Sequence, residues 1–346
     1  MRPLGLRGRW SRLAGDLRRL RREALGMNRR NLAFLVPYNL PALFALVDHK
    51  PATKRALSAA GIAVPATYAE LALHWDLRRL EAVLAGRTEF VVKPARGSGG
   101  GGVQVIAGRR GAEWVKASGA TLSLPDLAHH CSDILAGAFA VGQRSDEVLI
   151  EYRVKADAVL GAISYRGVAD VRVMVFRGVP VQAMLRLPTR ASDGRANLHM
   201  GGMGVGVDLA SGRTVYGFRG RHAALTHPDL GRPVVGVTVP SWEMILAIAA
   251  RCYQAVPLGY LGVDVVVDGD LGPLVLELNA RPGLTIQLAN RRGLRPVMDA
   301  VAAQDVERMS VAERVCLGRA LAEPAGTRSL SERLAEIGGQ RDPLCL

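Results

Sequence analysis

The sequence has few cysteines, few aromatic residues and no long apolar run. Its four cysteines, among 346 residues, form neither a Cys-x-x-Cys pair nor a zinc-ligand spacing, so we expect a reduced, cytoplasmic protein. No apolar segment is long enough to span a bilayer, and the N-terminus lacks the apolar core of a signal peptide. Because aromatic residues contribute only 5%, the core is expected to consist mainly of Leu, Val, Ala and Ile.

The formal charge of +14 is distributed unevenly along the chain. Residues 1–30 hold ten arginines against Asp16 and Glu23, so the basicity belongs mainly to one N-terminal arm. A basic body that binds nucleic acid is therefore not expected. The length, with 49% hydrophobic residues, is enough for two or three lobes that each have a core.

Within the arm, apolar residues recur at spacings of three and four. Trp10, Leu13, Leu17, Leu20 and Ala24 form one stripe with arginines around it, which predicts an amphipathic helix. One interpretation docks this helix on the body of the protein or on a second subunit. The other places it on an anionic membrane surface, where basic amphipathic helices can lie.

Strand-like segments at hairpin spacing alternate with helical segments in the rest of the chain. Strands are indicated at EFVVKP, VLIEYRV, VADVRVMVF and GVDVVVD. Helices are expected over 51–61, 68–85, 241–256 and 294–320. This pattern favours α+β lobes over a parallel doubly wound sheet.

The segment 262–283 is the most informative part of the sequence. Its residues 268–273 (DGDLGP) indicate a turn between two strands. Folding the segment symmetrically about this turn places Asp264 opposite Glu277, and strand alternation adds Asn279 to the same face. Such oxygen donors suit Mg²⁺ together with phosphate oxygens. The alternative is a solvated sheet face that carries ordinary acids.

A second segment, FVVKPARGSGGGGVQVI, reads as strand, loop and strand. Lys93 ends the first strand, and the loop can bring backbone N–H groups close to phosphate oxygens. A strand follows the loop, so it is neither a Walker A motif nor a Rossmann turn. A flexible surface loop is the alternative. The loop residues concerned are Ser98, Gly99, Gly100, Gly101 and Gly102.

Two arginines lie in strand-like segments between these motifs. Arg172 shares a strand face with Asp170, and Arg186 ends a second strand. Arginine binds carboxylate or phosphate through paired hydrogen bonds, although a surface ion pair is the simpler explanation. Further on, Asn197 and His199 precede a Gly-Gly pair.

Taken in order, these segments resemble the ATP-grasp superfamily, and more narrowly its α-L-glutamate-ligase-like branch related to RimK. The matching pieces are KPxxGSGGGG, ANLH and GVD…LELNARPG, within about residues 48–300. The resemblance implies an α+β ATP-grasp fold with two lobes that clasp ATP. A short basic helical arm stands where typical members carry a Rossmann-like domain. The implied divisions are an arm and connector (1–47), an N-terminal lobe with the flap (48–148), a C-terminal lobe with the Mg-ATP site (149–304), and a C-terminal helix and tail (305–346).

The resemblance also implies a set of metal and reaction-site residues. Asp264 and Glu277 would hold one Mg²⁺ (or Mn²⁺), and Glu277 with Asn279 a second. Arg186 would stabilise the transferred phosphoryl group or the tetrahedral intermediate, and Arg172 would bind a substrate carboxylate. The position implied for Asn197 is near phosphate and metal.

A nucleotide site follows from the same resemblance. Lys93 would contact the ATP phosphates, as would Lys54 or Lys50, while the loop Ser98–Gly102 closes over them. The hinge that bonds adenine would comprise Glu151, Tyr152 and Val154, with Asp157 on the ribose.

The implied activity is an ATP-dependent carboxylate–amine ligase that works through an acyl phosphate on an amino acid or peptide, with glutamate as one candidate substrate. The absent Rossmann-like lobe leaves room for a second subunit or a partner protein at the substrate site. Two alternatives stay open: an ATP-binding regulatory or scaffold protein without turnover, and an ATP-grasp enzyme for a sugar- or polymer-linked substrate.

Overall fold

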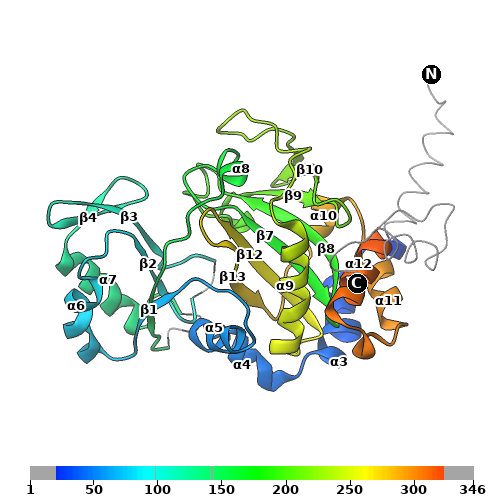
Figure 1. Ribbon diagram of the computed structural model, residues 1–346, viewed down its shortest axis with the longest axis horizontal. Helices are drawn as coiled ribbons and strands as arrows, with labels where there is room; N and C mark the ends of the chain where they lie inside the picture. The colour runs from blue at the N-terminus through cyan, green and yellow to red at the C-terminus, as the bar shows by residue number, and fades with distance from the viewer. Residues whose placement is uncertain (1–20, 98, 141, 143, 323–346) are drawn as a thin grey trace.

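The computed structural model describes residues 21–97, 99–140, 142 and 144–322. Its strands form two antiparallel sheets, one in each of two lobes that lie side by side (Figure 1). The strand order is β1-β6-β2-β3-β4-β5 in the first sheet and β11-β10-β9-β8-β7-β12-β13 in the second. Helices cover these sheets, so the α+β prediction is confirmed.

The smaller lobe comes first in the chain. Its core contains Phe90 and Trp114, whose rings meet edge to face. Helix α7 begins at a capping box in which Ser123 and Asp126 exchange hydrogen bonds. The elements are β1 (Thr67–Leu71), a 3₁₀ turn (His74–Arg79), α6 (Leu80–Leu84), β2 (Phe90–Pro94), β3 (Gln104–Arg110), β4 (Glu113–Lys116), β5 (Thr121–Leu122), α7 (Leu124–Leu135) and β6 (Val148–Glu151).

The larger lobe carries the longer strands. Its elements are α8 (Ala158–Gly161), β7 (Asp170–Phe176), β8 (Val179–Leu187), a 3₁₀ turn (Leu198–Met200), β9 (Met203–Val207), β10 (Thr214–Arg219), β11 (His222–Ala223), α9 (Trp242–Ala255), β12 (Tyr260–Asp268), β13 (Gly272–Asn279), α10 (Ile286–Asn290), α11 (Arg295–Ala302), a 3₁₀ turn (Val306–Arg308) and α12 (Val311–Ala322).

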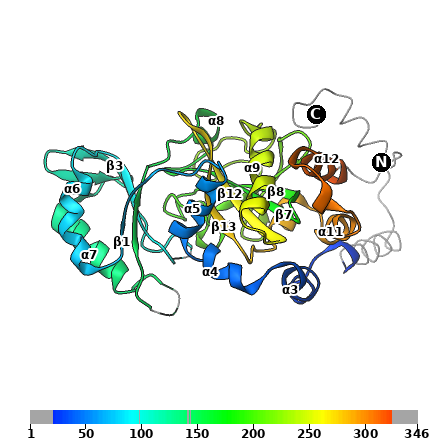
Figure 2. The same ribbon diagram turned by 60° about the horizontal axis from the view of Figure 1, so that its bottom comes forward.

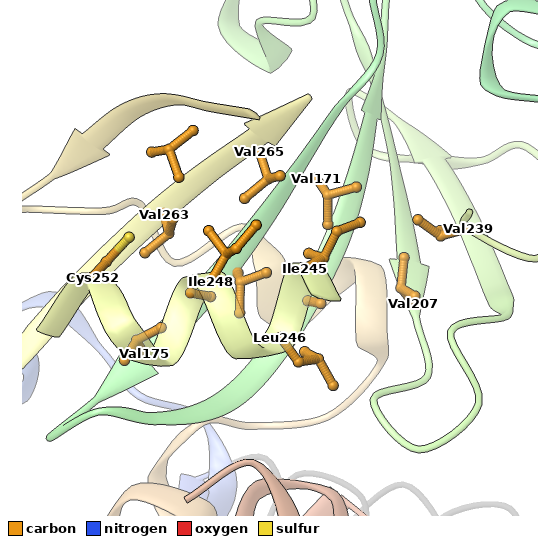
Figure 3. Close-up of a cluster of buried hydrophobic side chains, with 14 of the residues drawn as sticks. Val171, Val175, Val207, Val239, Ile245, Leu246, Ile248, Cys252, Val263 and Val265 are labelled. Carbon is orange, nitrogen blue, oxygen red and sulfur yellow. The ribbon is translucent and has the colours of Figure 1, made fainter. Parts of the chain in front are cut away.

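Helix α9 closes one face of the larger sheet. Ile245, Leu246 and Ile248 from the helix meet Val171 and Val263 from the strands in one buried cluster (Figure 3). Burial of these branched side chains provides the main stabilisation of the lobe. The opposite face of β7 and β12 is left for the polar residues described below.

Residues 21–47 form a run of short helices that leads to α5 (Lys50–Ala59). The run contains α2 (Met27–Arg29), a π-helix (Arg30–Leu35), α3 (Val36–Tyr38), a 3₁₀ turn (Pro41–Leu43) and α4 (Phe44–Val47). Most of the predicted apolar stripe, from Trp10 to Leu20, lies outside the described residues. Within the described ranges no single helix has the length and apolarity to cross a membrane. One bent pair, Arg21–Tyr38 and Pro41–Val47 at 93°, meets the criterion by length and composition only.

Three predictions about local structure need correction. Residues 68–71 of the helix predicted over 68–85 belong to strand β1 instead, because this segment pairs with the edge of β6. The helix predicted over 294–320 is broken between α11 and α12 by the turn around Val306. The prediction that the cysteines are reduced fits Cys131 and Cys252, which are free and buried, but not Cys316, which is disulfide-bonded. Spacing along the chain could not reveal this, because it does not show which thiols meet in space.

Candidate functional site

A cavity of about 1100 Å³ is lined by residues of both sheets. The smaller lobe contributes Lys93 from β2 and Glu151 from β6, while the larger lobe contributes Asp264 and Glu277. This is the arrangement in which a ligand can be held between two lobes.

The acid hairpin has the predicted pairing at the site but not at its turn. Asp264 on β12 is paired with Glu277 on β13. Close to the turn, however, Asp268 pairs with Gly272, which leaves a three-residue loop. The ladder shifts by one residue at Leu276, a β-bulge that restores the predicted pairing further along. The turn thus lies within residues 268–273 as predicted, but the hairpin is asymmetric, so the prediction of symmetric folding about the turn is wrong.

Asp264 is the centre of a buried ion cluster on the cavity floor. It lies opposite Arg172 on β7, whose Nε and Nη2 both donate to its carboxylate. Arg186 on β8 donates from Nη2 to the same carboxylate at 2.7 Å and from Nε to Asp170. The amide nitrogen of Asn279 adds a bond at 3.1 Å. Arg172 and Arg186 are thus not surface ion pairs but parts of a network from which water is largely excluded.

The pKa values of the two acids in this cluster move in opposite directions. Burial raises the pKa of Asp264, but the guanidiniums of Arg172 and Arg186 outweigh it and hold that pKa at about 2. For Asp170 the effect of burial exceeds that of Arg186, and the Asp264 carboxylate adds to it, so its pKa rises to about 6. Asp264 therefore carries its negative charge at neutral pH.

Glu151 holds two lysine ammonium groups at the other wall. Its Oε1 lies 2.5 Å from Nζ of Lys93 and its Oε2 lies 2.6 Å from Nζ of Lys54. Burial raises the pKa of Glu151, but the two ammoniums outweigh it and lower that pKa below its ordinary value. Lys93 lines the main cavity, whereas Lys54 lines a separate cavity of about 390 Å³.

Lys50 reaches the main cavity from the first turn of α5. Its Nζ donates to the carbonyl oxygen of Gly97 and lies 4.0 Å from a carboxylate oxygen of Glu277. Burial lowers the pKa of Lys50 more than Glu277 raises it. The sequence left open whether Lys50 or Lys54 contacts the ATP phosphates. In the structure Lys50 lines the main cavity, whereas Lys54 does not line it and pairs with Glu151.

The glycine loop is fixed at its C-terminal end. The carbonyl oxygen of Gly102 lies 2.8 Å from Nε2 of His130, and a Cβ on Gly102 would come within 2.6 Å of the Phe139 ring. Gly101 lines the cavity, while Ser98 lies outside the described residues. Only glycine fits at position 102, because φ there is +71° and no space is left for a side chain.

The middle of the loop rests on the segment that follows β8. A Cβ on Gly99 would lie 3.5 Å from Nδ2 of Asn197, and one on Gly100 would lie 3.2 Å from Cδ of Arg195. Asn197 also caps the 3₁₀ turn by accepting from the N–H of His199. The loop thus covers one wall of the cavity, and Asn197, Arg195 and His199 line it.

The predicted adenine hinge lines the cavity, whereas the predicted ribose contact does not. Tyr152 and Val154 line it, and Val154 packs with Val266 and Leu274 in a small apolar cluster. Such a surface suits the flat face of a purine. Asp157, the predicted ribose contact, is not among the lining residues. Its carboxylate instead accepts from two N–H groups at the start of α8.

The predicted metal ligands offer the oxygen donors that Mg²⁺ prefers. The side chain of Glu277 is 38% exposed and faces the cavity. Asn279 uses its amide nitrogen on Asp264, which leaves its oxygen for a cation. In the described part of the chain, no three His, Cys, Asp or Glu side chains converge as a metal site. The donor set therefore fits a hard cation that is bound together with phosphate.

Sequence reasoning gave Asp170 no role in the site and did not decide between Lys50 and Lys54 for the phosphates. Asp170 was placed on the face of Arg172 by strand alternation, but its buried pairing with Arg186 depends on the register between β7 and β8. The cavity position of Lys50 depends on how α5 packs against the loop at Gly97. Neither contact has a signal in local sequence.

Two antiparallel sheets around a cavity with a glycine loop and an acid hairpin define an ATP-grasp protein. The sequence model of the family described as sugar-transfer associated ATP-grasp matches residues 29–303. This protein belongs to that family, and the predicted superfamily and fold are confirmed. The narrower resemblance to RimK is supported only in part, because the matching family carries a different description.

Three solved structures align with much of this chain at low sequence identity. The ATP-grasp ligase PsnB, complexed with a minimal precursor, has 18% identity and a TM-score of 0.41 over 77% of this chain and 63% of its own. The D-alanine–D-alanine ligase of Bacillus anthracis has 18% identity and a TM-score of 0.39, over 79% and 64%. A RimK domain protein of Sphaerobacter thermophilus has 17% identity and a TM-score of 0.40, over 71% and 64%. This chain thus spans less than two thirds of each of these proteins. No curated protein matches its sequence.

Proposed function

We propose that this protein is an ATP-dependent ligase that joins a carboxylate to an amine through an acyl phosphate. The observation that carries this proposal is the composition of the cavity. It brings cationic Lys50, Lys93 and Arg186 together with the oxygen donors Glu277 and Asn279. Phosphoryl transfer depends on positioning and charge neutralisation more than on a protein nucleophile, and these side chains supply both.

The lysines are assigned to the phosphates of ATP. Burial of Lys50 leaves its ammonium poorly solvated, so a phosphate oxygen would add an anionic partner that stabilises its charge. Glu151 orients Lys93 with a contact of 2.5 Å and thereby fixes where its charge lies. The loop at Gly99–Gly101 would complete the enclosure of the phosphates and keep water from the acyl phosphate.

The arginines are assigned to different tasks. Arg186, whose Nε and Nη2 are held by Asp170 and Asp264, has a fixed guanidinium beside the position of the transferred phosphoryl group. Arg172 donates from both Nε and Nη2 to Asp264. We therefore assign Arg172 to positioning Asp264, in place of the substrate carboxylate contact expected from the sequence.

The metal would be held by Glu277 and Asn279, with Asp264, whose carboxylate accepts from the Asn279 amide, as a third oxygen donor. When bound, Mg²⁺ neutralises phosphate charge during the transfer. In the reaction, an oxygen of the substrate carboxylate attacks the γ-phosphorus and ADP leaves. The amine nitrogen then attacks the carbonyl carbon, loses a proton, and phosphate leaves.

The proposal is tested by measuring ADP and phosphate release with Mg²⁺ against a panel of amino acids and peptides, with glutamate among them. Hydroxylamine in the reaction should trap the acyl phosphate as a hydroxamate. Hydroxamate that forms with one acid and depends on ATP would support the ligase. ATP binding without turnover on any substrate class would favour the regulatory or scaffold alternative.

A sugar- or polymer-linked substrate is the second candidate, and the family description favours it. Aminosugars and sugar acids therefore belong in the same panel. Turnover with these compounds, and none with free amino acids, would identify this second candidate.

A further inference from the structure

Four large apolar side chains lie exposed along the helices that precede α5. Met27, Leu32, Val36 and Leu40 are between 63% and 75% exposed. Met27, Leu32 and Val36 recur every four or five residues, the spacing of one face along α2, the π-helix and α3, and Leu40 follows just after α3 ends. These four residues are called the apolar ridge below. In Figure 2 the segment from α3 to α4 runs along the lower edge of the larger lobe.

The opposite face of the same helices is firmly packed. Phe34 and Tyr38 both meet Phe176 edge to face, at 5.4 and 5.0 Å between ring centroids. The side chain of Asn39 donates to the carbonyl oxygen of Tyr260 at 2.8 Å and accepts from its N–H at 2.7 Å. The ridge is therefore held outward by a docked scaffold, and its exposure does not come from a loose segment.

The charges in the described segment that carries the ridge are mainly positive. Arg21, Arg22 and Arg29 are exposed in it, and Glu23 is the one acid among residues 21–47. Residues 24–47 contain no aspartate or glutamate, and residues 1–30 hold ten arginines against two acids. Apolar side chains among arginines complement a surface that offers both hydrocarbon and negative charge.

We propose that the apolar ridge docks on an anionic lipid bilayer, with the four side chains in the acyl region and the arginines at the headgroups. The helices lie flat in the interface and do not span it, because Phe34, Tyr38 and Asn39 keep their inner face on the protein core. The proposal does not depend on the ligase reaction.

The ridge lies close to one rim of the cavity. Arg30 donates from Nη1 to the carbonyl oxygen of Pro282 at 3.3 Å, and the guanidinium of Arg281 stacks 4.2 Å from the Phe44 ring centroid. Arg281 and Pro282 line the cavity. Docking would therefore place this rim of the cavity near the headgroups.

The experiment is vesicle co-sedimentation of the full chain. Vesicles of phosphatidylcholine are compared with vesicles of an equimolar mixture of phosphatidylcholine and phosphatidylglycerol. The test variant combines Leu32→Ser, Val36→Ser and Leu40→Ser. A matched control combines Leu73→Ser, Met244→Ser and Leu271→Ser. These three residues are also large and apolar, and they are between 55% and 65% exposed elsewhere on the surface. Thermal unfolding of all three proteins establishes that each is folded.

The wild type should bind the anionic vesicles, and added salt should weaken this binding. Loss of three buried apolar contacts should reduce the affinity of the ridge variant by about tenfold or more, while the control changes by less than about twofold. Equal binding by the ridge variant and the wild type would overturn the proposal. So would a wild type that self-associates in sedimentation velocity while the ridge variant is monomeric, because the ridge would then be a subunit interface.

Discussion

Asp264 and Glu277 lie directly opposite one another on β12 and β13, although the hairpin that joins them is asymmetric. The turn has a three-residue loop, which shifts the strand register by one residue relative to a symmetric hairpin. The unpaired residue Leu276 shifts the register back, so that Asp264 pairs with Glu277. The two carboxylates differ in burial and in the charged groups around them. Asp264 is buried among guanidiniums, whereas Glu277 faces the cavity, where Lys50 is the one cation within 4.0 Å among the described residues.

The first prediction follows from this difference. Glu277→Gln keeps the shape of the side chain but removes the charge that would bind a cation, so ATP turnover should fall by about a hundredfold or more. Asp270→Asn is the matched control, because Asp270 lies on the same hairpin but pairs with Lys155 at the surface. ADP release measures both. Similar turnover in the two variants would remove Glu277 from the metal site.

The pairing of Asp264 with Glu277 could be predicted from the sequence, because strand alternation and a turn signal both act over short distances. The ion pairs of Asp264 with Arg172 and Arg186 could not, since they require the order β8-β7-β12 in the sheet. The same reason explains why Lys54 and Lys50 were not told apart. They are four residues apart on α5, and only the packing of the two lobes decides which one meets Glu151.

The second prediction concerns the stability of the ion cluster. Arg172→Met leaves the buried carboxylate of Asp264 with fewer partners, which should lower the free energy of unfolding by about 3–5 kcal/mol. Arg190→Met should have little effect, because Arg190 is an exposed residue 3.8 Å from Asp229. Urea denaturation gives both values. Adding Asp264→Asn to Arg172→Met should recover part of the loss, and a further loss of similar size would contradict this explanation.

The third prediction separates the two lysines of α5. Lys50→Met should weaken ATP binding by about tenfold or more, since it removes a charge-assisted contact to phosphate. Lys54→Met should have a smaller effect on ATP but a larger one on stability, because Glu151 then keeps only Lys93. Calorimetric titration with ATP and urea denaturation are run on both variants. The reverse order of ATP affinities would assign the phosphate to Lys54.

The fourth prediction is a pH dependence at Glu151. Its pKa in the folded protein lies below its ordinary value of 4.5. The resulting stabilisation is complete above about pH 4.5 and is lost as the pH falls through the folded-state pKa. Glu151→Gln does not titrate, so its stability should decline less steeply with acid than that of the wild type. Denaturation midpoints between neutral pH and about pH 3 measure the two slopes, and parallel curves would show that Glu151 is not held ionised.

The fifth prediction tests how the glycine loop is anchored. Alanine at Gly102 would meet the Phe139 ring at 2.6 Å, at a φ of +71°. Alanine at Gly111 has a similar φ of +61° but finds no atom within 4 Å. Both variants carry the backbone strain of a left-handed residue, about 1 kcal/mol, and only the first also displaces the loop. ATP affinity should therefore fall by about tenfold in Gly102→Ala and change little in Gly111→Ala. If the two variants bind ATP equally well, contact with Phe139 does not set the position of the loop over the phosphates. The contacts of Gly99 and Gly100 with Asn197 and Arg195 would then hold the loop in place.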